Sequence, residues 1–312
     1  MGFLNEIRSR INSVQSTRQI TSAMKMIASS KHHKAQDAIE RFLEYQNELL
    51  RVYGDFMEYK ARERINVDVP YHNIKEEKKI AIVAVTSNMS MCGAFNENVV
   101  KKLTNVVEEY QSKHIEKITI FPIGTYISKR VRNISGIEVY ESNLDDMIKN
   151  VQFDAALQLT EMLINRYGDG RYDKIELIYN HGKSRSTQLV LRETFLPFSF
   201  AMVDTLETLS ATEEVNVGDE KKHDEKVYYN NFLLEPGPQK IIDELVPKLV
   251  KMKMYTMLLD SAAAEQSARM IAMQIATDNA DNLLQELKMQ YNKQRQQAIT
   301  NELLDIVGGT LK

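Results

Sequence analysis

The side chains best suited to chemistry are few and widely separated in this chain. It has one cysteine, Cys92, and six histidines among 312 residues. Cys92 follows an apolar run and could lie near a helix N-terminus, where the pKa of a thiol falls and the thiolate becomes reactive. No histidine stands at a spacing that would give it a base, so we interpret Cys92 as a small packed thiol. A single cysteine also excludes an internal disulfide and a zinc site built from several cysteines.

The histidines form no ligand or catalytic pattern. His32 and His33 are adjacent, so on a helix they point about 100° apart and cannot bind one metal ion together. We interpret both as solvated basic positions, and we place His181 and His223 in loops without acidic partners at ligand spacing. The chain has no GxSxG, HExxH or paired-carboxylate signature. We therefore expect no catalytic residues and no metal site.

Phosphate-binding motifs are missing as well. The sequence contains neither GxxxxGK[ST] nor GxGxxG. The turn that follows the first apolar run, residues 86–96, has one glycine, Gly93. Such a turn cannot easily present a row of backbone N–H groups to a pyrophosphate. We expect a strand-to-helix turn that docks on another surface, and no cofactor; a nucleotide-binding enzyme remains an alternative.

Charge limits the classes of partner. Forty Lys and Arg against 43 Asp and Glu give a net charge of −3, which supplies no general attraction to nucleic acid or to an anionic membrane. No apolar run reaches the roughly 18 to 20 residues that span a bilayer, and the N-terminus lacks the apolar region of a signal peptide. Residues 1–36 are basic, with one acid, Glu6. No aromatic residue between Phe3 and Phe42 could stack on a base, so we expect this segment to face an acidic protein surface.

The helix breakers show which elements carry these residues. Glycine and proline are missing from residues 3–53 and again from residues 248–307. Proline costs about 3 kcal/mol and glycine about 1 kcal/mol inside a helix, so both gaps predict long uninterrupted helices. Apolar side chains at alternating spacings of three and four residues predict a coiled-coil seam, at Ala35, Ala38, Phe42, Tyr45, Leu49, Val52, Phe56 and Tyr59 and at Thr277, Ala280, Leu284, Leu287 and Tyr291. The two helices either pair antiparallel within one chain or each pair with their copy in a homodimer.

The middle of the chain has a different pattern. Residues 79–86, 117–124 and 174–180 are continuous apolar runs of the kind found in strands buried on both faces. Helical patterns at residues 94–112 and 144–167 separate them, so an α/β layer with a mostly parallel sheet is predicted. The expected division is an N-terminal helix (1–62), an α/β domain (75–210), a polar loop (211–230) and a C-terminal helix (238–307).

Blocks near both ends resemble one known family. The first holds Ile7-Arg8-x-Arg10-Ile11-x-Ser13-Val14 and Ile20-Thr21-x-Ala23-Met24-Lys25-Met26-x-Ala28. The second holds Glu265-x-x-Ala268-Arg269-Met270-x-Ala272-Met273-x-x-Ala276-Thr277-x-Asn279-Ala280, followed by Tyr291-Asn292-Lys293-x-Arg295-Gln296. Together they resemble the γ subunits of F-type ATP synthases, which form the central rotor shaft of F1.

The resemblance implies both a fold and a role. The fold is an antiparallel coiled coil of the two terminal helices with an inserted Rossmann-like α/β domain. The role is a non-catalytic rotor that couples ATP synthesis or hydrolysis to rotation and proton translocation. Its partners would be the α and β subunits (α3β3), the ε subunit and the c ring. The protein would then reach the membrane only through its complex, as a peripheral component at the cytoplasmic face of a bacterial membrane rather than in an organelle.

Contact residues follow from the matched positions. The resemblance implies that Met24, Lys25, Glu265 and Arg269 face the lower β-subunit loops. Nearer the tip, inside the hexamer, it places Arg295, Gln296, Thr300 and Glu302. Glu235 belongs to the foot, which meets ε and the c ring.

One departure leaves alternatives open. The family often shows Ser-Asp-x-Gly-Leu-Cys-Gly-x-x-Asn after the first central strand, but this chain has Asn88 in place of the acid and Ser90 in place of the first glycine. The polar stretch at residues 211–226 is also unusual. The chain could thus be the rotor of a diverged F1-like ATPase with different partners at its foot, or a free-standing coiled-coil adaptor.

Overall fold

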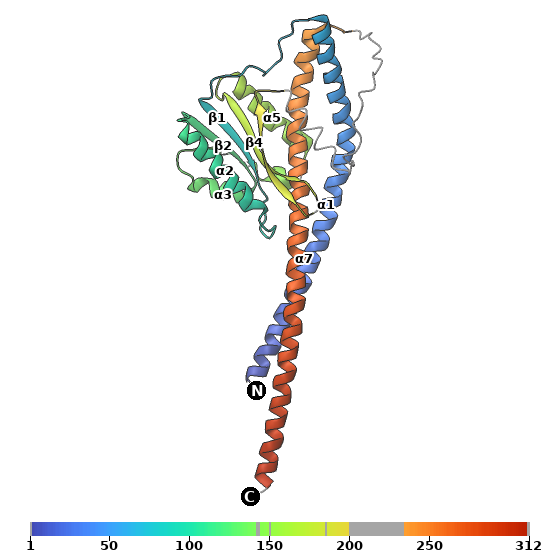
Figure 1. Ribbon diagram of the computed structural model, residues 1–312, viewed down its shortest axis with the longest axis vertical. Coiled ribbons are helices and arrows are strands. Elements are labelled where there is room, and N and C mark those ends of the chain that lie inside the picture. The colour runs from blue at the N-terminus through green and yellow to red at the C-terminus, as the bar shows by residue number, and fades with distance from the viewer. Residues whose placement is uncertain (1, 142–143, 150, 185, 200–233, 311–312) are drawn as a thin grey trace.

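Two long helices and one α/β unit make up the protein (Figure 1). The computed structural model describes residues 2–141, 144–149, 151–184, 186–199 and 234–310. Helix α1 spans Gly2–Glu63 and helix α7 spans Pro238–Thr310. At 1.5 Å per residue they are about 90 Å and 110 Å long. The predicted polar loop and the end of the predicted α/β domain, at residues 200–233, lie outside the described residues.

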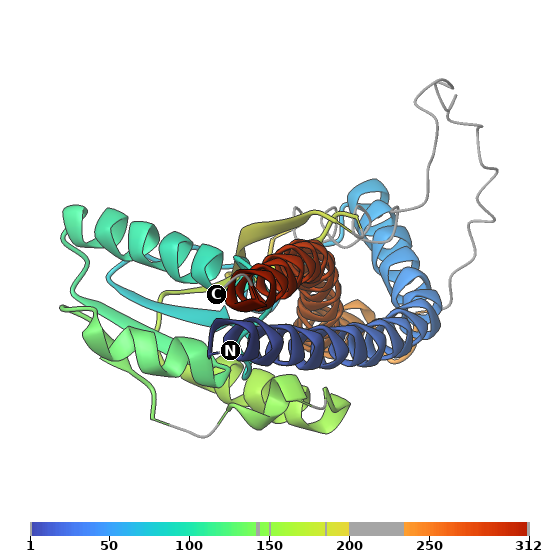
Figure 2. The same ribbon diagram turned by 90° about the horizontal axis from the view of Figure 1, so that it is seen from below.

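Helices α1 and α7 lie side by side and run antiparallel within one chain (Figures 1 and 2). The Thr21 and Thr277 hydroxyls are 2.8 Å apart, and Thr256 donates a hydrogen bond of 3.0 Å to Gln46. The residue numbers of the contacting positions therefore increase along α1 and decrease along α7, as in an antiparallel pair. The pairing follows the intrachain expectation, and we call the two helices together the shaft.

The spacing predicted for the seam falls on three buried positions in α7 and misses at two positions in α1. Ala280, Leu284 and Leu287 are buried in α7. In α1, however, Tyr45 and Val52 are exposed, and the residues that follow them, Gln46 and Tyr53, are buried. This part of α1 packs against the α/β unit as well as against α7, as shown by the ring of Tyr53, which lies 5.8 Å from that of Phe198.

Helix α7 begins at Pro238, ten residues before the stretch without glycine or proline at residues 248–307. Proline fits the first turn, where its missing N–H has no intrahelical partner, and Pro238 occupies that place. Pro247 lies inside the helix and removes one backbone hydrogen bond. The surrounding Leu245, Val246 and Leu249 are buried against the α/β unit, and their burial offsets that loss.

The sheet has five strands in the order β3-β2-β1-β4-β5. Their bounds are β1 Lys79–Val85, β2 Lys117–Ile123, β3 Glu138–Val139, β4 Lys174–Gly182 and β5 Gln188–Leu196. The first four are parallel, and β5 runs antiparallel to β4. The predicted strands correspond to β1, β2 and β4, whereas β3 and β5 were not expected.

Helices cover both faces of the sheet (Figure 2). Helix α2, Phe95–Ser112, packs on one face, and helix α5, Phe153–Gly168, packs with α7 on the other. Short helices α3 (Thr125–Arg130), η1 (Val131–Asn133) and α4 (Asp146–Lys149) lie in the connections. The single helix expected at residues 144–167 is instead divided into α4 and α5, so that prediction was wrong at the break.

Candidate partner interfaces along the shaft

Helix α7 occupies the place where many α/β sheets bind a ligand. In open α/β sheets the ligand crevice lies outside the carboxyl ends of the strands where the chain switches faces, here between β1 and β4. In this chain Cys92 and Phe95, just after β1, pack against Ala264 and Ala268 of α7. Asn180 of β4 closes the same corner by donating to the Phe95 carbonyl at 3.0 Å. The turn after β1 therefore docks on the shaft, as the missing phosphate motifs led us to expect.

The β1–α2 turn is stabilised by internal hydrogen bonds, and its thiol is unreactive. The Asn96 carboxamide accepts a bond of 3.0 Å from the Ser87 N–H and donates one of 3.2 Å to the Cys92 sulfur. Burial raises the pKa of the Cys92 thiol, so at neutral pH it stays protonated and unreactive. The interpretation of Cys92 as a packed thiol is confirmed.

Glu265 and Arg269 form a buried ion pair next to this turn. The Arg269 Nη1 donates to Glu265 Oε1 at 2.6 Å, and Nη2 donates to the Met89 carbonyl at 3.2 Å. Burial raises the pKa of Glu265, and the Arg269 guanidinium opposes that rise. Both side chains are less than a tenth exposed. They join α7 to the β1–α2 turn in this chain and leave little surface for a partner.

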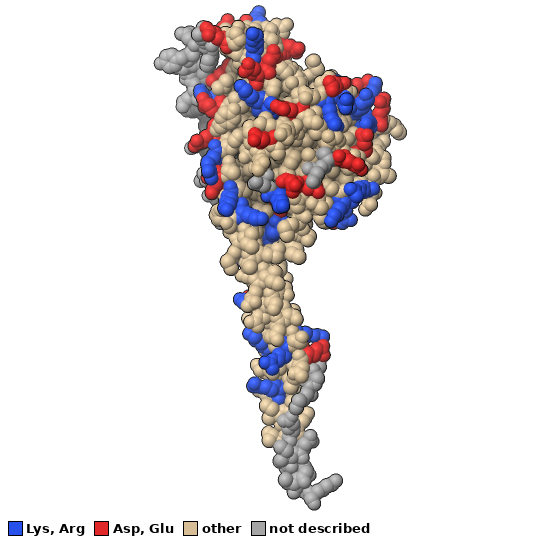
Figure 3. Space-filling view, turned by 180° about the vertical axis from the view of Figure 1, so that it is seen from behind, with Lys and Arg blue, Asp and Glu red and all other residues tan. Residues whose placement is uncertain are grey.

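Met24 and Lys25 lie on the other helix and are half-buried. Lys25 borders a shallow hollow of about 530 Å³ formed by one face of α1. Its other lining residues are Met26, Ser29, Ser30, His33 and Lys34. On the narrow part of the shaft the charged side chains are mainly Lys and Arg on the face shown in Figure 3. This surface fits an acidic protein partner.

The predicted tip residues lie toward the C-terminal end of α7. Arg295, Gln296 and Thr300 are exposed, and α7 here continues past the beginning of α1 (Figure 1). Ile299, Leu303 and Leu304 are also about half exposed or more. Glu302 lies on the same helix. The tip therefore offers a mixed apolar and polar surface on a single helix.

Glu235 lies at the opposite end, just before α7, and is exposed. The predicted contacts thus fall at separate levels along the molecule and do not form one site. This spacing suits a chain that meets several partners along its length. Among the described residues no group of three or more His, Cys, Asp or Glu could hold a metal ion, and no described helix is long and apolar enough to cross a membrane.

Two histidine interpretations were wrong. His32 is buried, and its Nδ1 lies 3.1 Å from the Ala263 carbonyl of α7. His181 lies within β4 rather than in a loop, with Nδ1 2.8 Å from Asp260 of α7. Both partners are far along the chain, so spacing could not reveal them; His33 is exposed as expected, and His223 lies outside the described residues.

Sequence reasoning also missed a buried lysine. Lys253 of α7 is 1% exposed, and its ammonium nitrogen is 2.6 Å from a Glu193 carboxylate oxygen of β5. Like His181 and Asp260, this pair joins the shaft to the sheet. Nothing near Lys253 in the sequence distinguishes it from the exposed Lys248 or the half-buried Lys251.

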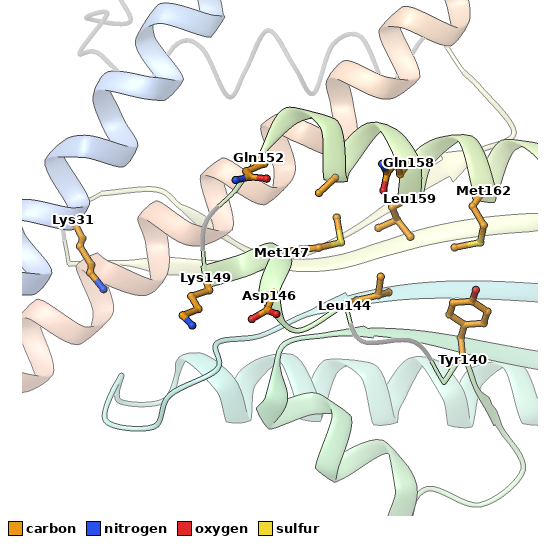
Figure 4. Close-up of a pocket in the computed structure, with 11 residues that line it drawn as sticks. Lys31, Tyr140, Leu144, Asp146, Met147, Lys149, Gln152, Gln158, Leu159 and Met162 are labelled. Atoms are coloured by element: carbon orange, nitrogen blue, oxygen red, sulfur yellow. The ribbon is translucent and has the colours of Figure 1, made fainter.

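A cavity with a volume of about 890 Å³ lies between the shaft and the α/β unit (Figure 4). Lys31 of α1 and Lys149 of α4 reach its rim from different elements, and Met147, Leu159 and Met162 form part of its apolar wall. The cavity has no glycine-rich turn of the type that cradles a phosphate.

Comparison with known proteins agrees with this geometry. A family model described as ATP synthase matches residues 3–311. Over its full length the chain is 43% identical to the whole ATP synthase gamma chain of Bacteroides thetaiotaomicron and 42% identical to that of Phocaeicola vulgatus. This chain belongs to the ATP synthase gamma-chain family.

Other gamma-family relatives and solved structures extend the likeness. The ATP synthase gamma chain of Flavobacterium johnsoniae is 38% identical over 99% of this chain and 98% of its own. A chain in the Euglena gracilis mitochondrial ATP synthase (OSCP/F1/c-ring) matches with a TM-score of 0.58 at 18% identity, covering 99% of this chain and 94% of that one. A chain in the Tetrahymena thermophila mitochondrial ATP synthase central stalk and c ring matches with a TM-score of 0.52, covering 82% and 99%. At such identities these structures support the fold alone.

Proposed function

We infer that this chain is the central-stalk subunit of an F1 ATP synthase, which couples ATP synthesis or hydrolysis to rotation. The observation that carries this conclusion is the match to a gamma chain over the entire length at 43% identity. The shaft of α1 and α7, with its α/β unit toward one end, supports it independently (Figure 1). The full-length match and the intrachain pairing both disfavour a free-standing adaptor.

The proposed role is mechanical and non-catalytic. ATP would be made or hydrolysed at catalytic sites of the β subunits in a surrounding α3β3 hexamer. An asymmetric shaft presents a different face to each of three sites, so its angle biases their nucleotide affinities, and by reciprocity each nucleotide event favours the next angle. The ligand crevice filled by α7 supports the absence of a nucleotide site in this chain.

Stiffness is the physical requirement of this role. We propose that α1 and α7 wind around each other as an antiparallel coiled coil, with residues 75–210 as an inserted domain. The apolar seam at Ala280, Leu284 and Leu287 supports this winding. A helix interrupted by glycine or proline would bend under torque, which accounts for their absence from residues 3–53 and 248–307.

The proposed contacts follow the shaft from tip to foot. Arg295, Gln296, Thr300 and Glu302 would lie deepest in the hexamer, and Met24 and Lys25 would meet acidic β-subunit loops. The place of Lys25 at the border of the hollow and the basic surroundings support the second group. Glu265 and Arg269 would act in the same zone from their buried positions.

At the foot, Glu235 would lie where the ε subunit and the c ring bind. Membrane association would then arise only through the complex, at the cytoplasmic face. Isolation of the complete complex tests this part: a c ring and ε at the foot support a conventional ATP synthase, and other partners would favour a diverged F1-like ATPase.

Co-expression with the α and β subunits tests the central claim. The wild-type chain is expected to co-purify with the hexamer in a fixed ratio, and Lys25→Glu is expected to reduce coupled ATP synthesis severalfold by repelling acidic loops. Lys101→Glu, an exposed change on α2, serves as the matched control. A wild-type chain that forms a stable homodimer and ignores the hexamer would refute the stalk assignment.

A further inference from the structure

The face of α7 that packs on the sheet carries two polar contacts of opposite polarity, a buried one at Lys253 and a half-buried one at Asp260. Lys253 and Asp260 are seven residues apart, so after two turns they project from the same side of the helix. Lys253 meets Glu193 of β5, and Asp260 meets His181 of β4. The helix therefore supplies a cation at one level and an anion at the next.

The Lys253–Glu193 contact is almost completely excluded from solvent. The two charged atoms are 2.6 Å apart, with side chains 1% and 11% exposed, at angles outside those of a hydrogen bond. Glu193 also accepts a bond of 3.3 Å from the Tyr179 hydroxyl. Ion pairs withdrawn from water are costly unless they are kept together, so this contact strongly penalises any separation of α7 from β5.

The Asp260 contact is tied to the end of β4. One carboxylate oxygen lies 2.8 Å from His181 Nδ1, and the other accepts the Gly182 N–H at 3.3 Å. A Cβ on Gly182 would lie 3.8 Å from the Ala264 methyl group and 3.9 Å from Asp260. Strand and helix backbones therefore approach closely here, which gives a carboxylate as short as that of Asp260 access to both partners.

Polarity makes this arrangement specific for one register. Apolar contacts between α7 and the sheet are non-directional and would tolerate a shifted helix. If α7 moved by two turns, Lys253 would lie beside His181, or Asp260 beside Glu193, leaving buried charges without their partners. The two contacts therefore fix both the height and the angle of the α/β unit on α7.

We propose that Lys253–Glu193 and Asp260–His181 are positioning residues that hold the α/β unit at a fixed angle on the shaft and carry torque between them. The inference rests on the proposed stalk function, because only a rotating shaft loads this joint. The narrow end of the shaft and the α/β unit would meet different partners, and a soft joint would let one turn without the other.

The test uses the complete ATP synthase with the double variant Lys253→Met/Glu193→Leu, which removes both charges and keeps apolar volume. Hydrolysis by the detached F1 part is expected to stay within about twofold of wild type, while ATP synthesis by the membrane-bound complex falls at least threefold. A role confined to folding would lower the amount of assembled complex but would not change synthesis per assembled complex.

Lys251→Met/Glu161→Leu is the matched control. This pair also joins α7 to the α/β unit at 2.6 Å but is 26% and 56% exposed, so water weakens it. Synthesis per complex should be unchanged. Equal losses in the control and the buried double variant would overturn the proposal.

A second variant and a direct distance measurement keep the proposal testable if the double variant fails to fold. Asp260→Asn keeps an acceptor for the Gly182 N–H and removes the charge opposite His181. Spin labels at Lys101→Cys on α2 and Lys288→Cys on α7 should give a single narrow distance in the parent and a broader distribution in either variant. Narrow distance distributions and full ATP synthesis in both variants would refute the proposed role of these contacts. A parent chain that never binds the hexamer would instead refute the stalk function.

Discussion

Arg269 shows how one side chain can link the two parts of the molecule. It neutralises Glu265 one turn away on α7 and donates to the Met89 carbonyl of the β1–α2 turn. Because the ion pair is buried, its main effect is to prevent an uncompensated charge rather than to add stability of its own. A coupling defect in an Arg269 variant could therefore arise from a displaced turn as well as from a lost partner contact.

Replacing Arg269 with alanine should destabilise the chain by about 3 kcal/mol, the usual cost of removing one member of a buried pair. The carboxyl of Glu265 would then lose the group that opposes the rise in its pKa. A group whose folded pKa is raised contributes favourably below its unfolded value of 4.5 and loses that contribution as the pH rises through the folded pKa. The deficit in urea unfolding should hence be larger at pH 7 than at pH 4.5.

Arg10→Ala provides the matched control for this measurement. Arg10 pairs with Glu6 at the same four-residue spacing and 2.7 Å, but both side chains are more than half exposed. Its loss should have little effect at either pH. A deficit of the Arg269 variant that is equal at both pH values would contradict the assigned role of Glu265.

At the scale of elements, unbroken helices and buried strands were predictable, and their pairing was only partly so. The absence of Gly and Pro predicted both long helices, and continuous apolar runs predicted β1, β2 and β4. Strand β5 was not predicted, because Arg192 and Glu193 interrupt its run of apolar residues. Arg192 pairs with Glu176 on the neighbouring strand and Glu193 pairs with Lys253 on α7.

Those partners also explain why the candidate site was only partly predictable. The family resemblance, rather than any local spacing, pointed to contact positions on the shaft such as Lys25. The partners of Lys253 and His181 lie 60 or more residues away in the sequence, at positions that no local pattern distinguishes. A sequence pattern predicts which face of an element is apolar, but it does not predict which buried charges will meet.

Helix continuity in α1 can be tested at an exposed position. Gln15→Pro removes a backbone hydrogen bond and should cost about 3 kcal/mol, with lower helicity by circular dichroism and with reduced coupling in the assembled complex. Gln15→Ala, at the same exposed position, should retain the helicity and the coupling of the parent. Wild-type coupling in the proline variant would show that a stiff α1 is not required.

On the scale of the whole molecule, the fold separates stability from contact. The two largest described cores lie on either face of the sheet, at the α/β end, whereas the far end of α7 extends alone beyond α1 (Figure 1). Side chains such as Leu303 and Leu304 are largely exposed there. Such positions can contribute to binding without contributing to folding.

Ending the chain after Ala298 tests this separation. The shortened chain should unfold within about 2 °C of the full chain, because the removed residues 299–312 include no part of either core. Its affinity for the α3β3 hexamer should fall, as measured by co-purification at increasing dilution. A large drop in the unfolding temperature would show instead that the tip supports the shaft.

The direction of the two long helices also limits how the protein can be modified. Both helix ends farthest from the α/β unit, at Gly2 and Thr310, point the same way (Figure 1). A purification handle or fluorescent fusion at either terminus would compete for the narrow space inside an encircling ring of subunits. The exposed turn at His114, between α2 and β2, is a better place for such an insertion because it projects from the opposite part of the molecule.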